Sequence, residues 1–123
     1  MEKFGSNGGP VKENSPFASA IKDENYISVS GTGGYDPETG KIADDFLGQA
    51  EQVLKNLIRT IKNAGGDPDK IVKTTCFIKD MSQYKEFNEL FHKYLPCQPT
   101  RSCIEVSRLP VDMLIEIEAI VKV

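Results

Sequence analysis

The stretch from residue 44 to residue 66 constrains the fold of this chain most strongly. Apolar side chains recur in it every three or four positions, at Phe46, Ala50, Val53, Leu57, Ile61 and Ala64. Asp44 and Asp45 precede this stripe and suit the positive end of a helix dipole, and Gly65 and Gly66 follow it as a stop. The pattern predicts an amphipathic helix whose apolar face must pack on another element.

The rest of the chain divides into strand-like runs and one further helix. Alternating or β-branched runs predict strands, and an apolar stripe that ends at Pro96 predicts the second helix. The expected strands are residues 17–21, 26–30, 71–79, 101–106 and 113–123, and the expected second helix is 80–95. The order ββαβαββ favours an α+β fold, a mixed sheet with both helices on one face.

With 123 residues, the chain has room for one domain, which we place at residues 16–123. Residues 1–15 hold three glycines and a proline and are expected to form a flexible N-terminal segment. They show neither the apolar core of a secretory signal nor an Arg-rich transit pattern, so no such signal is expected. No stretch is long and apolar enough to suggest a membrane span.

The charge balance argues against nucleic acid as a partner. The net charge is −3, and the fifteen Lys and Arg residues are scattered among acidic ones, without a basic stripe. The aromatic residues Tyr84, Phe87, Phe91 and Tyr94 recur at helical spacing, which indicates a core stripe more than a base-stacking platform.

Three cysteines, Cys76, Cys97 and Cys103, are an odd number without C-x-x-C spacing. They therefore indicate neither a disulfide framework nor a zinc site, and we expect a reducing compartment, the cytoplasm. His92 is the only histidine, and His92 with Cys97 gives too few ligands for a metal. We expect no metal and no cofactor.

Candidate chemistry is concentrated in the last two predicted strands. The connection 107–112 is short enough for a hairpin, which would place Cys103 opposite Glu116 and Arg101 opposite Glu118. Apolar residues alternate with these polar ones, so the polar side chains are expected to share the face opposite the core.

Two interpretations of that polar face remain open. It is either a solvated surface with a cross-strand Arg–Glu pair and no function, or a face that meets another subunit and binds a ligand. In the second case, Arg101 would bind a carboxylate through its planar fork of donors, and Glu116 would hold a water or move a proton. Cys103 as a covalent nucleophile is disfavoured, because no sequence feature lowers its pKa.

Several segments resemble one known family. They are Pro99 to Pro110 (PTRSCIEVSRLP), Leu114 to Ala119 (LIEIEA), Ser30-Gly31, Asp36 to Gly40 (DPETG), and Val72 to Asp80 (VKTTCFIKD) leading to Asn88. Together they resemble the RidA/YjgF family from Phe17 onward.

The resemblance implies a chorismate-mutase-like fold, assembled as a homotrimer with clefts between neighbouring subunits. It implies an enamine/imine deaminase that converts reactive 2-aminoacrylate-type intermediates into 2-keto acids and ammonia. By the same resemblance, Arg101 would bind the substrate carboxylate and Glu116 would position the attacking water. Backbone groups of Gly31 and Cys103 would assist, and Ser30 and Asn88 would line the cleft.

The sequence departs from the family pattern at two places. Phe17 stands where the family has a cleft tyrosine, and Thr32 stands where it has a glutamine. A missing hydrogen-bond donor in a closed site costs on the order of 1–3 kcal/mol, so the substrate or the turnover is expected to differ. Two alternatives remain. One is an endoribonuclease L-PSP-type translation inhibitor, a name that some members of the family carry; the other is a non-catalytic, metabolite-binding or chaperone-like trimer that has lost turnover through Phe17.

Overall fold

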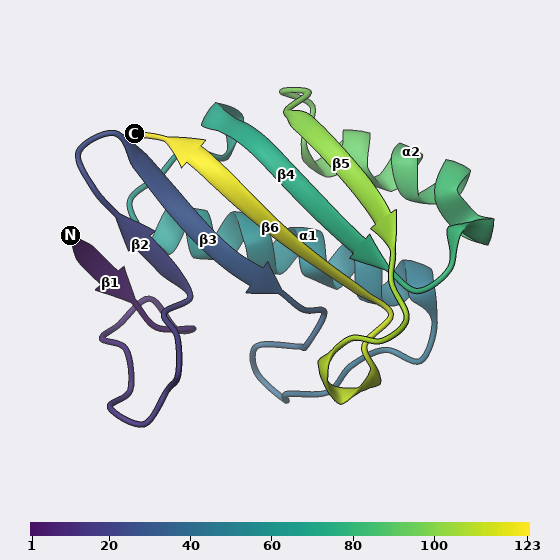
Figure 1. The fold of residues 1–123 in the computed structure, drawn as a ribbon, viewed down its shortest axis with the longest axis horizontal. Helices are drawn as coiled ribbons and strands as arrows, with labels where there is room; N and C mark the ends of the chain where they lie inside the picture. Colours follow the sequence, from purple (N-terminus) through teal and green to yellow (C-terminus); the bar gives the residue numbers. More distant parts are fainter.

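The computed structural model describes residues 1–123 and shows six strands in one mixed sheet, with both α-helices against the same face (Figure 1). The α+β prediction is therefore confirmed. In chain order the elements are β1 (Glu2–Phe4), β2 (Ala20–Lys22), β3 (Tyr26–Thr32), α1 (Phe46–Asn63), η1 (Pro68–Lys70), β4 (Ile71–Ile78), η2 (Met81–Gln83), α2 (Tyr84–Tyr94), β5 (Thr100–Glu105), η3 (Pro110–Asp112) and β6 (Ile115–Lys122).

Helix α1 confirms the apolar stripe, because the side chains at its stripe positions are buried against the sheet. The carboxylate of Asp45 accepts from the backbone N–H of Gly48 and caps the first turn. Gly65 has a φ of 79°, a left-handed conformation that costs glycine little, and the helix ends there. The second helix begins four residues later than expected, at Tyr84, because Asp80 caps the short η2 turn instead.

The sheet order is β1-β2-β3-β6-β4-β5, and it corrects the expected pairing of the last two strands. β5 and β6 are not neighbours. β5 pairs in parallel with β4, and β6 lies antiparallel between β3 and β4. Helix α2 forms the crossover between β4 and β5, and such a crossover places two parallel strands side by side. β6, with every second side chain fully buried, gains two partners at the centre.

The corrected pairing changes the environment of the candidate residues. Cys103 lies opposite Cys76 on β4, not opposite Glu116, and Arg101 lies opposite Thr74, not opposite Glu118. Because Thr74 and Cys76 are buried on the helix-covered face, Arg101 and Cys103 point to that face as well. The expectation that Arg101 and Glu116 share one face is therefore wrong.

Residues 2–4 form an edge strand that the sequence did not suggest, paired antiparallel with β2. The first predicted strand, 17–21, is shifted to β2 (Ala20–Lys22), and it turns into β3 as expected. The side chain of Asp23 accepts from the backbone N–H groups of Asn25 and Tyr26 and so stabilises this turn. The flexibility of residues 1–15 stays a prediction.

Candidate active site

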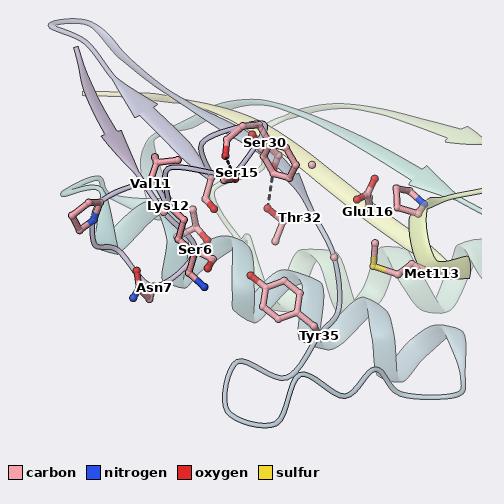
Figure 2. Close-up of a pocket in the computed structure, with 18 residues that line it drawn as sticks. Ser6, Asn7, Val11, Lys12, Ser15, Ser30, Thr32, Tyr35, Met113 and Glu116 are labelled. Atoms are coloured by element: carbon pink, nitrogen blue, oxygen red, sulfur yellow. Dashed lines mark hydrogen bonds between the residues drawn. The ribbon is translucent and has the colours of Figure 1, made fainter.

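A cavity of about 520 Å³ lies between the N-terminal loop, the end of β3 and the start of β6. Its volume falls in the range of small-molecule sites. Figure 2 shows Glu116 and Met113 at one end of it and Ser6, Asn7 and Lys12 at the other. Of the residues expected at the site, the cavity contains Phe17, Ser30, Gly31 and Glu116.

Glu116 reaches the cavity because it points away from the helices. Its neighbours in β6, Ile115 and Ile117, are fully buried on the helix side, so Glu116 is turned to the open face. A Cβ atom placed on Gly31 would lie 3.4 Å from Oε2 of Glu116, so this carboxylate rests against the glycine backbone. That distance is ordinary van der Waals contact, so a methyl group at position 31 would fit beside the carboxylate.

The electrostatic setting of Glu116 is that of a carboxylate without a cation. The two ion pairs of the chain, Lys55–Glu51 and Arg108–Asp112, do not include it. Desolvation by burial raises the pKa of Glu116 above its ordinary value. Such a group is a better proton acceptor, once ionised, than a fully solvated glutamate.

The end of β3 is held by its own hydroxyls. Ser30 Oγ donates to the carbonyl of Ala18, and Thr32 Oγ1 donates to the carbonyl of Ser30. Phe17 lines the same cavity with 62% of its surface exposed, so its ring occupies an open rim.

Asn56 on α1 positions the loop that follows β3. Its buried amide nitrogen donates to the carbonyls of Gly33 and Tyr35, and its Oδ1 accepts from Gln52 and Arg59. All of its polar atoms are thus used, and the cavity wall at Gly33 and Tyr35 is fixed to the helix. Sequence reasoning missed this residue, although a polar side chain beside the apolar stripe of α1 was a signal.

Arg101, on β5, lies in a separate environment, with its side chain against α2. Its Nη2 donates to Tyr84 Oη at 2.9 Å and to Asn88 Oδ1 at 2.7 Å. The guanidinium carbon lies 4.8 Å from the ring centroid of Phe91 and 5.6 Å from that of Phe87. All of these neighbours are neutral, and no carboxylate of the chain lies within 4.0 Å of Arg101. A half-buried cation is therefore left without an anion.

Cys103 and Asn88 lie on the Arg101 side. Burial raises the pKa of the Cys103 thiol, although Arg101 opposes the shift, and burial raises that of Cys76 to about 12. Both thiols are therefore poor nucleophiles near neutral pH, in agreement with the low weight given to covalent catalysis. His92 is exposed in the last turn of α2, and no three His, Cys, Asp or Glu side chains are grouped to hold a metal ion.

The aromatic stripe of α2 is partly as expected. Phe87 and Phe91 are buried in the core, whereas Tyr84 is 40% exposed and Tyr94 donates its hydroxyl to Glu51 on α1. The contact of Tyr84 with Arg101 was not expected, because the helical spacing of Tyr84 placed it in a core stripe and gave no sign that its hydroxyl has a polar partner.

The chain is thus an α+β domain with a ligand-sized cavity that Glu116 enters from the open face of the sheet, and with an arginine without an ionic partner on the helix-covered face. The family can also be stated. The chain belongs to the RidA/YjgF family, and the family model described as Endoribonuclease L-PSP matches residues 10–123. Neither helix has the length and apolar character needed to cross a membrane.

Similar proteins include two named deaminases. The chloroplastic Reactive Intermediate Deaminase A of Arabidopsis thaliana is 42% identical over 107 residues, which cover 85% of this chain and 57% of that protein. The 2-iminobutanoate/2-iminopropanoate deaminase of Salmonella typhimurium is 38% identical over 109 residues, 85% of either chain.

Solved structures agree with the fold along the whole chain. RidA from an Antarctic Psychrobacter superimposes with a TM-score of 0.90 at 31% identity and full coverage of both chains. Escherichia coli TdcF with bound serine gives a TM-score of 0.88 at 31% identity, covering 100% of this chain and 99% of that one.

Proposed function

We propose that this protein is an enamine/imine deaminase that hydrolyses small 2-imino acids to 2-keto acids and ammonia. The names of its relatives support the reaction class. The observation that carries the proposal is the Arg101 guanidinium, which is half-buried, oriented by neutral acceptors and without an anion. A buried charge of this kind is stabilised when a ligand supplies the opposite charge, and a 2-imino acid has a carboxylate to offer.

The site is proposed to form between subunits. Arg101 is on the helix-covered face of the edge strand β5, and Glu116 is on the open face of the central strand β6. A substrate of a few atoms cannot touch both groups of one chain, because the sheet separates them. A second copy that brings its β5 edge to the cavity of the first would unite them, in a repeating contact that closes as a homotrimer.

In this site between two subunits, each candidate residue has a proposed role. Arg101 binds the carboxylate, with Asn88 and the backbone of Cys103 beside it. Gly31, Ser30 and Phe17 of the neighbouring copy line the other wall, next to Glu116. Gly31 lies beside the Glu116 carboxylate, because a Cβ atom placed on it would be 3.4 Å from Oε2.

The chemistry requires placement and one proton carrier. The enamine first tautomerises to the imine, whose carbon is electrophilic. Glu116 accepts a proton as water adds to that carbon and passes it to the nitrogen, which gives a carbinolamine. Glu116 then takes the proton of the new hydroxyl and delivers it to the amino nitrogen; the C–N bond breaks, ammonia leaves, and the hydroxyl oxygen becomes the keto oxygen. The sum is imine plus water to keto acid plus ammonia, with no cofactor consumed.

A coupled assay tests the proposal. A pyridoxal-phosphate dehydratase acting on serine or threonine generates the imine, and keto acid is followed with and without this protein. We expect acceleration by the native chain and at least a hundred-fold loss of the accelerated rate in Arg101→Ala. Arg108→Ala is the control, because Arg108 forms an exposed ion pair with Asp112. Unchanged acceleration in Arg101→Ala would contradict the proposal.

The same preparation separates the two alternatives. Binding of a keto acid without any acceleration would indicate a metabolite-binding protein. Cleavage of labelled RNA that disappears in Arg101→Ala would indicate a ribonuclease, the activity in the family model's name. The net charge of −3 and the absence of a basic stripe weigh against RNA as a substrate.

A further inference from the structure

We infer that the hydroxyl group of Tyr84 is a second donor to the substrate carboxylate, acting beside Arg101. The inference rests on the proposed role of Arg101 as the carboxylate-binding residue. It adds a residue on α2 that none of the motifs shared with the family includes.

The direction of one hydrogen bond leads to this inference. Arg101 Nη2 and Tyr84 Oη lie 2.9 Å apart. A guanidinium has no acceptor, so the phenol oxygen accepts in this contact and its own hydrogen remains available. No protein group accepts that hydrogen, since the contact with Arg101 is the one hydrogen bond of the Tyr84 hydroxyl. With 40% of Tyr84 exposed, a ligand can reach it.

The N–H donors that remain free on Arg101 also support a second donor from Tyr84. Nη2 carries two hydrogens, and Tyr84 Oη and Asn88 Oδ1 occupy both. Each planar fork of a guanidinium, the end-on pair and the side-on pair, includes Nη2. While the two bonds stand, Arg101 offers a carboxylate single contacts from Nη1 or Nε. The second carboxylate oxygen then needs another donor, and the Tyr84 hydroxyl is in contact with the guanidinium.

The proposed geometry is therefore a mixed clamp. One carboxylate oxygen accepts from an N–H of Arg101, and the other accepts from the O–H of Tyr84. Asn88 serves as the positioning residue that holds Nη2 in place. The clamp forms in the ground state and persists in the transition state, because the carboxylate takes no part in the reaction.

Tyr84→Phe tests the clamp, because it removes the hydroxyl and keeps the ring that packs 5.4 Å from the guanidinium carbon. Tyr94→Phe is the matched control: it makes the same change on the same helix, at a hydroxyl bonded to Glu51. Affinity for 2-oxobutanoate is measured by calorimetry, and kcat and KM are measured in the coupled assay with threonine as the source of imine.

We expect Tyr84→Phe to weaken 2-oxobutanoate binding and to raise KM about ten-fold, the lower range for a hydrogen bond to a charged group. Its kcat should stay within about two-fold of the native value, as for an interaction of equal strength in ground and transition states. Tyr94→Phe should match the native protein in both.

Three outcomes would overturn the inference in distinguishable ways. Native affinity and KM in Tyr84→Phe, with binding lost in Arg101→Ala, would remove Tyr84 from the clamp and leave the proposed function intact. A fall in kcat without a change in KM or in affinity would mean that Tyr84 acts in the transition state alone and is no part of the carboxylate clamp. Native binding in Arg101→Ala would instead remove the proposed function on which the clamp rests.

Discussion

Arg101 and Glu116 lie on opposite faces of the same sheet, the first on the edge strand β5 and the second on the central strand β6. The two side chains have complementary properties, since one is a cation without an anion and the other a carboxylate without a cation. Within one chain they cannot neutralise each other. This separation is the reason for proposing that both act on one substrate across a contact between subunits.

Glu116 is expected to give the reaction an acid limb. Because burial raises its pKa, Glu116 loses its proton at a higher pH than an exposed glutamate, which titrates near about 4.3. The ionised form accepts the proton of water, so kcat/KM should fall as pH drops through the raised pKa. Glu116→Gln should lower kcat by about a hundred-fold or more and abolish the limb. A pH–rate profile from about pH 4 to 8 checks this. If the acid limb of kcat/KM were unchanged in Glu116→Gln, a group other than Glu116 would be responsible for it.

The raised pKa of Glu116 also predicts that replacing this residue stabilises the folded protein at neutral pH, although the replacement lowers activity. A carboxyl with a raised pKa binds more protons in the folded than in the unfolded state, so its contribution is favourable at low pH and is lost as pH rises through the folded pKa. At pH 7, Glu116→Gln should therefore raise Tm slightly. Below the unfolded pKa the gain should vanish, because both side chains are then neutral. If Glu116→Gln and the native protein had equal Tm at pH 7 as well as at low pH, Glu116 would carry no desolvation cost.

Phe17→Tyr should restore a donor at the rim of the cavity. Phe17 is 62% exposed, so a hydroxyl fits there without disturbing the core. We expect kcat/KM for 2-iminopropanoate to rise by up to about ten-fold, the value of one net hydrogen bond, and Tm to stay the same. Phe17→Leu, which adds no hydroxyl, should show no gain. An equal response of the two variants would mean that no donor is missing at this position.

Asn56→Ala should lower the free energy of unfolding by about 2–4 kcal/mol, because it leaves the carbonyls of Gly33 and Tyr35 without their donor. Denaturant unfolding measures this change. Asn63→Ala is the control, an exposed asparagine at the end of the same helix. Similar losses in both variants would contradict the anchoring role of Asn56.

Ile120→Glu should interfere with assembly. Ile120 projects from the open face of β6 with 40% of its surface exposed, and no element of its own chain covers that face. A buried, unpaired charge at a subunit contact is strongly unfavourable, so light scattering should report a smaller species than for the native protein. Lys85→Glu on the exposed side of α2 should not change the mass. A native mass for Ile120→Glu would place the contact elsewhere.

Local patterns in the sequence predicted the elements well. The stripe from Phe46 to Ala64 identified α1, and the alternation of β6 predicted which of its side chains are buried. Both signals arise from residues close together in the chain. The alternation placed Glu116 on the face opposite the core, as it did Glu118, and the resemblance to the family singled out Glu116.

The position of Arg101 could not be derived in the same way. Strand pairing is non-local, and the short connection 107–112 favoured a hairpin that the α2 crossover excludes. The alternation of β5 also misled: it predicts that Ile104 faces the core and Arg101 the opposite side, whereas Ile104 is 46% exposed and Arg101 is half-buried. The guanidinium is accommodated on the helix side by the rings of Phe87 and Phe91, and a pattern of hydrophobicity does not report such a contact.

Mixing two inactive variants shows whether one site takes Arg101 and Glu116 from two different subunits. Arg101→Ala and Glu116→Gln are unfolded together in equal amounts, refolded, and assayed for keto-acid release. If each site takes Arg101 from one subunit and Glu116 from the next, about a quarter of the sites in randomly mixed trimers combine both native residues. We predict recovery of about a quarter of the native activity; no recovery, with native mass and fold, would mean that the site is not shared between subunits.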